Sequence, residues 1–219
     1  MKKFFCLHGL PRAGNTLLGS IINQNPKVAV TANSIIADML GELYLLQNTD
    51  IFKNFPDHKS FDNATKSLIQ SYYKDWPQDY IIDRNPWGLP INLKFLKKVQ
   101  DEIKIIVLVR DVPEILASFI KWSERESTSF VNQYEAKTVE EKCDMLMNQE
   151  GQIVKELIGI KHLLDHHPKE MYHIVEYNDL CDDPKQTVEG IYDFLGIYRF
   201  NHRYANLDQF YVNGMKYDD

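Results

Sequence analysis

Short, continuously apolar runs recur along the chain and alternate with longer amphipathic stretches of helical spacing. Continuous rather than alternating apolar runs are typical of strands in a parallel sheet that is covered on both faces. Such runs lie at residues 3–7, 28–30, 80–83, 104–109 and 171–175. The pattern therefore predicts a three-layer α/β fold, with a central, mainly parallel sheet flanked by helices. Ligands of such folds bind at the carboxyl ends of the strands.

The intervening stretches carry helix start and stop signals. Helices are predicted over residues 14–24, 34–47 and roughly 60–74, the second with Asn33 or Ser34 as its N-cap. A further helix begins at residue 112, with Asp111 as a candidate N-cap and Pro113 in its first turn.

Two later helices have strong caps. The segment "TVEE" is a capping box in which Glu141 can reach back to the Thr138 amide, and apolar residues follow at helical spacing as far as Leu164. The last helix reads "DPKQTVEGIYDFLG", which Asp183 caps and Gly196 ends.

Composition restricts the possible functions. The chain has 219 residues without a linker-like segment or repeat, which predicts a single domain over 1–219. Its net charge of −6 argues against a general nucleic-acid or membrane-surface partner. An anionic ligand must therefore be held by a local cluster of cations.

The location is expected to be cytoplasmic. Apolar runs such as "IIVLV" at 105–109 are too short to span a bilayer, and the start of the chain lacks a small-residue cleavage site. The 3 cysteines are an odd number without metal-like spacing, which favours unpaired thiols in a reducing compartment.

The stretch "HGLPRAGNTLL", residues 8–18, lies between a predicted strand and a predicted helix. Gly9, Gly14 and Thr16 fit the phosphate-binding pattern G-x-x-x-x-G-K-[ST], whereas Asn15 occupies the lysine position. The glycines allow backbone amides at the helix N-terminus to approach an anion, and Arg12 supplies the only cation of the loop. The missing lysine weakens the case for phosphoryl transfer from ATP.

A second candidate site lies in "IKIIVLVRDVPEILASFIKW", residues 103–122. The predicted strand ends at Arg110, and Ser118 lies about two turns into the next helix, so both could hold one phosphate. Each charge-assisted hydrogen bond of this kind contributes roughly 1.5–3 kcal/mol. In the alternative interpretation, Arg110 only forms a salt bridge with Asp111 or Glu114.

Together these motifs resemble those of the sulfotransferase superfamily that uses 3′-phosphoadenylyl sulfate (PAPS). The family's 5′-phosphosulfate loop commonly reads G-x-P-R-S-G-T-T-L-L, and its 3′-phosphate motif is a strand ending in V-R-D with a serine eight residues after the arginine. The segment "YNDLCDDPKQTVEGIYDFLG", residues 177–196, resembles a late family motif. The likeness spans most of the chain in the correct order and is nearer to the tyrosylprotein and bacterial members than to the cytosolic phenol and steroid enzymes.

The resemblance implies transfer of a sulfuryl group from PAPS to a hydroxyl or amine acceptor, without a metal. Arg12 and the amides of Ala13, Gly14, Asn15, Thr16 and Leu17 would bind the 5′-phosphosulfate. Arg110 and Ser118 would bind the 3′-phosphate, and Tyr177 would contact the nucleotide. The acceptor would be a small molecule, a glycan or a peptide.

The resemblance also bears on catalysis. Arg84 in "YIIDRNPWG" occupies the place of a family lysine, where a cation would stabilise charge on the leaving bisphosphate. Strand alternation should point Arg84 and Asp83 apart. The position of a family glutamate falls on Asn33, which cannot accept a proton as a carboxylate would. Asp38, Asp83 and His8 are then the nearest candidate bases by sequence. The alternatives are an amine or an already acidic hydroxyl as the acceptor, catalysis without a strong base, or a degenerate enzyme.

Other features carry less weight. His162 and His166 are spaced for a metal on one helix face, but without an evident third ligand they are interpreted as a polar helix end. The aromatic tail after residue 197 could close over a ligand or simply cover the core, and Trp76, Trp87 and Trp122 are predicted core or rim residues. The alternative functions are a P-loop nucleotide kinase and a nucleotide-binding relative without turnover.

Overall fold

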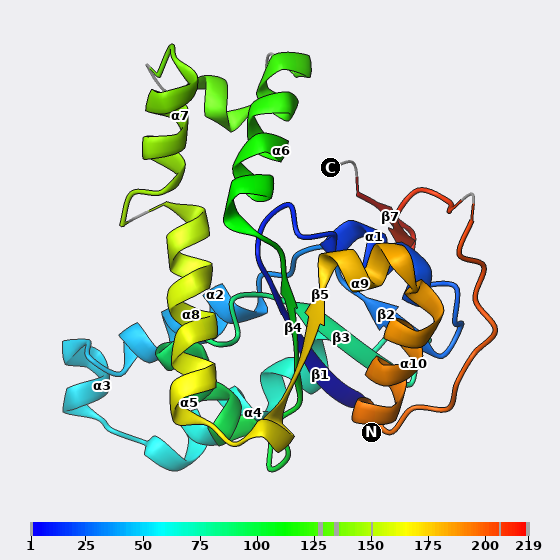
Figure 1. Ribbon diagram of the computed structural model, residues 1–219. Helices are drawn as coiled ribbons and strands as arrows, with labels where there is room; N and C mark the ends of the chain where they lie inside the picture. Colours follow the sequence, from blue (N-terminus) through cyan, green and yellow to red (C-terminus); the bar gives the residue numbers. More distant parts are fainter. Residues whose placement is uncertain (1, 127–128, 134–135, 150, 206, 218–219) are drawn as a thin grey trace.

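A five-stranded, fully parallel sheet forms the centre of the molecule (Figure 1). The computed structural model describes residues 2–126, 129–133, 136–149, 151–205 and 207–217. The strands follow the order β2-β3-β1-β4-β5 in the sheet. Their bounds are Lys3–Gly9 (β1), Val28–Val30 (β2), Tyr80–Arg84 (β3), Ile105–Val109 (β4) and Tyr172–Glu176 (β5). These strands confirm the fold class and all the predicted strand positions.

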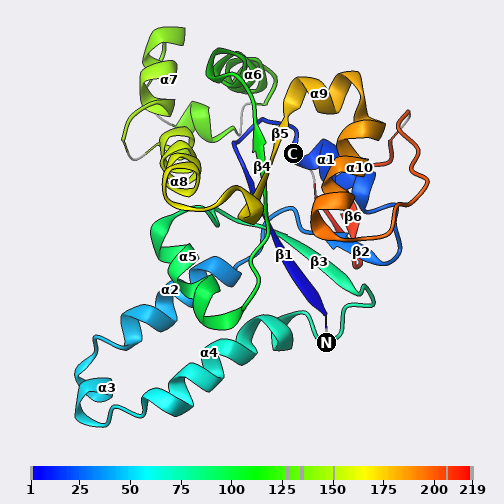
Figure 2. The same cartoon turned by 60° about the horizontal axis from the view of Figure 1, so that its bottom comes forward.

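Helices cover both faces of this sheet, which explains why its strands are continuously apolar. Figures 1 and 2 show α1, α9 and α10 on one face, and α2, α4, α5 and α8 on the other. The helices are α1 (Asn15–Ile22), α2 (Ile36–Leu46), α3 (Asp50–Asn54), α4 (His58–Tyr72), α5 (Pro90–Val99), α6 (Val112–Arg125), α7 (Val139–Leu146), α8 (Gln152–His166), α9 (Tyr177–Asp182) and α10 (Pro184–Leu195).

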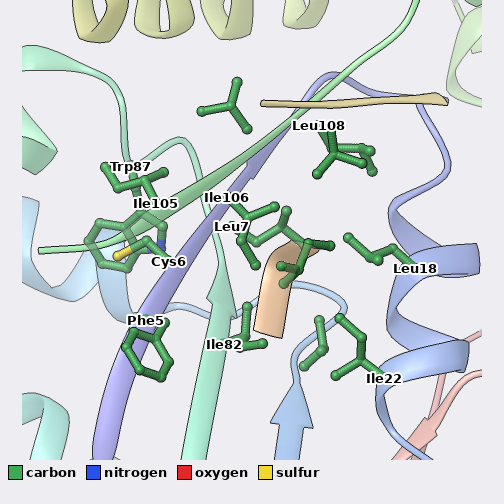
Figure 3. Packing of buried hydrophobic residues seen from close by; sticks show 14 of the residues in the cluster. Phe5, Cys6, Leu7, Leu18, Ile22, Ile82, Trp87, Ile105, Ile106 and Leu108 are labelled. Atoms are coloured by element: carbon green, nitrogen blue, oxygen red, sulfur yellow. The ribbon is translucent and has the colours of Figure 1, made fainter. Parts of the chain in front are cut away.

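The core is built from the inner strands and the helices next to them. Leu7, Ile82 and Ile106 are fully buried, and Figure 3 shows them near Leu18 and Ile22 of α1. Trp87 is also fully buried, which confirms its predicted core position, and Trp76 packs against the core while remaining partly exposed.

The capping predictions are mostly confirmed. Thr138 and Glu141 form the predicted capping box, and Asp183 caps α10, which ends at Gly196 with φ 69°. Asp111 occupies the N-cap of α6, but its side chain makes no capping hydrogen bond. The N-cap of α2 is Ile35, and the predicted Ser34 instead accepts a hydrogen bond from the Ile36 amide at 3.2 Å.

Some elements differ from the prediction. The apolar pattern after Thr138 does not form one helix, because α7 ends at Leu146 and α8 begins only at Gln152. A Cβ on Gly151, the N-cap of α8, would lie 2.5 Å from the Leu146 carbonyl oxygen, so the chain turns where only glycine fits. Helices α3, α5 and α9 were not predicted, and neither were the 3-10 helices Phe130–Gln133 and Lys169–Met171 or the short hairpin of β6 (Tyr211–Val212) and β7 (Met215–Lys216). In the described part of the chain, no helix has the length and apolar character needed to cross a membrane.

Candidate functional site

The carboxyl ends of the parallel strands converge on one cavity of about 380 Å³, here called the arginine cavity. Gly9 ends β1, Arg84 ends β3, Arg110 follows β4, and Tyr177 follows β5. The predicted site residues that line this cavity are Arg12, Gly14, Asn15, Thr16, Asn33, Arg84, Arg110, Ser118 and Tyr177. None of its described lining residues is acidic, so a chain of net charge −6 has here a local concentration of positive charge.

The loop after β1 has an unusual backbone. Gly14 is the N-cap of α1 with φ 89°, and Arg12 has φ 58°. Residues other than glycine rarely adopt a positive φ, because this backbone conformation costs them free energy. Asn15, in the lysine position of the ATP-binding pattern, is buried, and its Nδ2 donates to the Leu10 carbonyl at 2.8 Å. A Cβ on Gly9 would lie 1.7 Å from Asn15 Oδ1, so Gly9 is needed for this packing.

The loop places the N-terminus of a helix at the cavity, an arrangement that suits an anion. Helix α1 begins at Asn15, and the first amides of a helix have no intrahelical acceptor and carry the positive end of its dipole. The Ala13 amide differs, because it donates to the Leu10 carbonyl at 3.2 Å. Neither Ala13, which is fully buried, nor Leu17 lines the cavity, so any role of these two residues is limited to their backbone.

Arg110 connects the two sequence motifs. Its Nε lies 2.9 Å from Glu114 Oε2, which is the salt bridge of the alternative interpretation. Its Nη1 also donates to the Arg12 carbonyl at 3.0 Å, and its guanidinium stacks on the Tyr177 ring, 4.0 Å from the centroid. Arg110 therefore supports the strained backbone at Arg12 while it lines the cavity.

The Arg12 side chain turns toward α6. Its Nε donates to Ser118 Oγ at 3.2 Å, and its guanidinium carbon lies 5.8 Å from the Trp122 ring centroid. Arg12 and Ser118, which the resemblance assigns to different phosphates, are thus in direct contact.

Tyr177 organises the cavity wall. A Cβ on Gly14 would lie 2.8 Å from Tyr177 Cδ2, so the ring packs directly over the loop and under Arg110. A hydrogen bond with Cys181, together with burial, raises the pKa of Tyr177, which remains a neutral phenol at physiological pH. Tyr177 therefore also positions Arg110, a role that the sequence motif alone did not indicate.

Arg84, the last residue of β3, is hydrogen-bonded to the loop that follows β2. Its Nη1 donates to the Ala32 carbonyl at 2.8 Å, and its amide donates to Thr31 Oγ1 at 2.9 Å. Asn33, the next residue of that loop, is exposed and lines the cavity. Asp83 points elsewhere, as strand alternation predicted, and accepts hydrogen bonds from Tyr73, Asn85 and Trp87.

None of the three candidate bases lines the arginine cavity. Asp83 is fully buried, and this burial raises its pKa. His8 of β1 is buried against α8, where its Nδ1 accepts from the Gly88 amide at 2.8 Å and its Nε2 lies 2.6 Å from Glu156 Oε2. Asp38 is exposed on α2.

Sequence reasoning missed several lining residues. Trp122 lines the arginine cavity as well as packing on the core, and Gln152 at the start of α8 and Tyr217 in the tail also line it. Phe210 of the tail is buried in the core and Tyr217 lines the cavity, while closure of the tail over a ligand stays a prediction. His162 and His166 stack with ring centroids 4.8 Å apart, and among the described residues no three ligating side chains gather as a metal site would require.

The fold and the cavity define an α/β protein whose phosphate-loop-like turn and arginines suit an anionic ligand. A family model described as "Sulfotransferase family" matches residues 5–201. The chain therefore belongs to the sulfotransferase family. No curated protein sequence matched it.

Solved structures of similar fold include several sulfotransferases. The sulfotransferase domain from the curacin biosynthetic pathway is 16% identical with a TM-score of 0.59, covering 91% of this chain and 75% of that one. A sulfotransferase from Alicyclobacillus acidocaldarius is 13% identical with a TM-score of 0.60, covering 95% and 87%. A mouse sulfotransferase complexed with PAP is 16% identical with a TM-score of 0.55, covering 91% and 60%. At these identities the likeness demonstrates the shared fold.

Proposed function

We propose that this protein transfers the sulfuryl group of PAPS to a hydroxyl or amine acceptor and releases 3′,5′-adenosine bisphosphate (PAP). One observation carries the proposal: the loop of Arg12, the pair Arg110 and Ser118, and the strand-end Arg84 all line a single cavity without a carboxylate among its described lining residues. A volume of about 380 Å³ is within the usual range of small-molecule sites. The mouse neighbour was solved with PAP, which supports the same nucleotide here.

Each group has a role in this proposal. The start of α1 and Arg12 bind the 5′-phosphosulfate, and Arg110 with Ser118 binds the 3′-phosphate that distinguishes PAPS from ATP. The acceptor oxygen or nitrogen attacks sulfur, and the bond from sulfur to the bridging phosphate oxygen breaks. The electron pair stays on that oxygen, where Arg84 stabilises the developing charge.

The alternatives have weaker support. A P-loop kinase needs a lysine at the position of Asn15, whose side chain instead holds the loop closed through the Leu10 carbonyl. A relative that binds nucleotide without turnover is favoured only by the lack of a carboxylate at Asn33. The free thiols, with Cys6 buried and Cys181 exposed, fit the proposed cytoplasmic location.

Calorimetry without divalent cations tests the nucleotide assignment. PAP should bind much more tightly than 5′-AMP, because only PAP supplies the 3′-phosphate for Arg110 and Ser118. Equal affinities would refute the assignment. An assay of PAP release from PAPS with mixed hydroxyl and amine acceptors then separates an enzyme from a binding-only relative.

A further inference from the structure

A second cavity, of about 180 Å³, adjoins the arginine cavity and is here called the aromatic cavity. Asn33 and Tyr217 line both cavities. Arg84 marks their border, since its guanidinium is bound to the carbonyl of Ala32, a residue of the aromatic cavity. If Arg84 lies beside the leaving oxygen of PAPS, the aromatic cavity opens at the sulfuryl end of the donor.

Aromatic side chains supply five of the 12 described lining residues of this cavity. Tyr73 and Trp76, just after α4, meet edge to face with ring centroids 4.9 Å apart. Phe210 and Tyr217 of the tail meet edge to face with ring centroids 6.1 Å apart. Such walls contact the faces and edges of a planar ring favourably. An engineered protein cavity of about 150 Å³ holds benzene, so the aromatic cavity suits one ring with a small substituent.

The polar groups of the floor are already paired. Thr31 Oγ1 accepts from the Arg84 amide, Ser34 Oγ accepts from Asn85 Nδ2 at 2.8 Å, and the Tyr73 hydroxyl donates to Asp83. These contacts use part of the hydrogen-bonding capacity of the floor, and the Arg84 guanidinium at the border adds a cation for a polar group on the ligand. This orients a ring inward with its hydroxyl toward the donor.

Charge selects among aromatic ligands. Aromatic walls can also bind cations. Here Arg84 lies at one border and Lys216 lines the rim, while no acidic residue occurs among the described lining residues. A cation would be repelled, whereas an ionised hydroxyl would be stabilised.

We propose that the acceptor is a single-ring phenol that binds in the aromatic cavity, an inference that rests on the proposed function. The phenol loses its proton to water, its oxygen attacks sulfur, and the bond from sulfur to the bridging oxygen breaks with the electron pair leaving on PAP. A phenol has a pKa near 10, and adjacent cations lower it. Transfer to phenols therefore needs no carboxylate base, which accounts for Asn33 at the position of the family glutamate.

The first experiment measures binding without turnover. Fluorine NMR of 4-fluorophenol with PAP-saturated protein should show binding, and Val212→Phe, which fills the aromatic cavity, should weaken it roughly tenfold or more while PAP affinity is unchanged. Val139→Phe, at an exposed position on α7, is the matched control. PAP binding without any 4-fluorophenol binding, or phenol binding that Val212→Phe leaves unchanged, would overturn the acceptor assignment alone. Failure to bind PAP would overturn both proposals.

The second experiment does not depend on a buried substitution. Met215 is 51% exposed at the rim, so Met215→Ala should fold normally and widen the cavity. It should raise the rate of sulfation of 2-naphthol relative to 4-fluorophenol, and an unchanged ratio would contradict the proposal. Benzyl alcohol, which has the ring without the acidic hydroxyl, should react far more slowly than phenol in wild type. A tyrosine-containing peptide, compared with free phenol, shows which of the two supplies the ring.

Discussion

Replacement of Arg110 by alanine tests the nucleotide site most directly. Arg110 lines the arginine cavity, and the proposal assigns it to the 3′-phosphate. Its Nε is engaged by Glu114 and its Nη1 by the Arg12 carbonyl, so a phosphate must use the remaining edge of the guanidinium. We expect the variant to lose at least one charge-assisted hydrogen bond to PAP, which costs about 1.5–3 kcal/mol, or roughly a 10- to 150-fold loss of affinity.

The same substitution also removes the support of the loop, and this second effect must be separated from the first. Without Arg110, the carbonyl of Arg12 loses its 3.0 Å hydrogen bond at a residue of positive φ. This loss lowers the affinity for every ligand that binds the loop, including 5′-AMP. The ratio of PAP to AMP affinity cancels the shared loss and isolates the contacts to the 3′-phosphate.

Calorimetry of both nucleotides on wild type, Arg110→Ala and Glu114→Gln gives this ratio. Glu114→Gln keeps an oxygen acceptor for Arg110 but removes a negative charge beside the proposed phosphate, so PAP affinity should rise modestly while AMP affinity stays constant. The charge effect is small because Glu114 is 43% exposed and screened by water. An unchanged PAP to AMP ratio in Arg110→Ala would refute the assignment of the 3′-phosphate to this arginine.

Three further substitutions test the loop, the core and the missing base. Gly14→Ala forces a side chain into φ 89° and toward Tyr177, so the unfolding free energy in urea should fall by about 1–2 kcal/mol or more and PAP binding should weaken; an unaffected variant contradicts this packing. Burial raises the pKa of Asp83, so its contribution to stability is present below its unfolded pKa and is lost as pH rises through the higher folded pKa. Asp83→Asn should therefore gain stability relative to wild type as the pH rises above the ordinary aspartate pKa of about 4 in urea titrations, and a difference that does not change with pH would count against that shift. Asn33→Glu supplies a base, so the rate of benzyl alcohol sulfation should rise roughly 10²-fold relative to the rate with phenol. An equal change for both acceptors would contradict this reasoning.

The central sheet and the loop could be predicted because they depend on local patterns. The run 105–109 is continuously apolar because β4 is covered on both faces, and Gly14 stands where a left-handed N-cap is required. The capping box at Thr138 is likewise a local interaction of neighbouring residues. Such features need no knowledge of distant parts of the chain.

The remaining features depend on distant packing. The sequence predicts Trp122 as a core or rim residue, and only the tertiary fold brings its ring beside Arg12. The contact of Arg12 with Ser118 joins residues 106 positions apart, which spacing cannot predict. The break between α7 and α8 had one local signal, Gly151, but the periodic apolar pattern around it suggested that the helix continued.

The two cavities are built from different parts of the fold, and this difference has a consequence for function. The groups proposed to bind the donor follow strand ends of the sheet, whose register the whole core maintains. The aromatic cavity is built from the end of α4, the loop after β2 and the short β6–β7 hairpin. Because helix ends and hairpins change more easily than a buried parallel sheet, family membership is a stronger guide to the donor than to the acceptor. The acceptor must therefore be inferred from this chain's own aromatic side chains, and from Asn33 and Arg84 at their border.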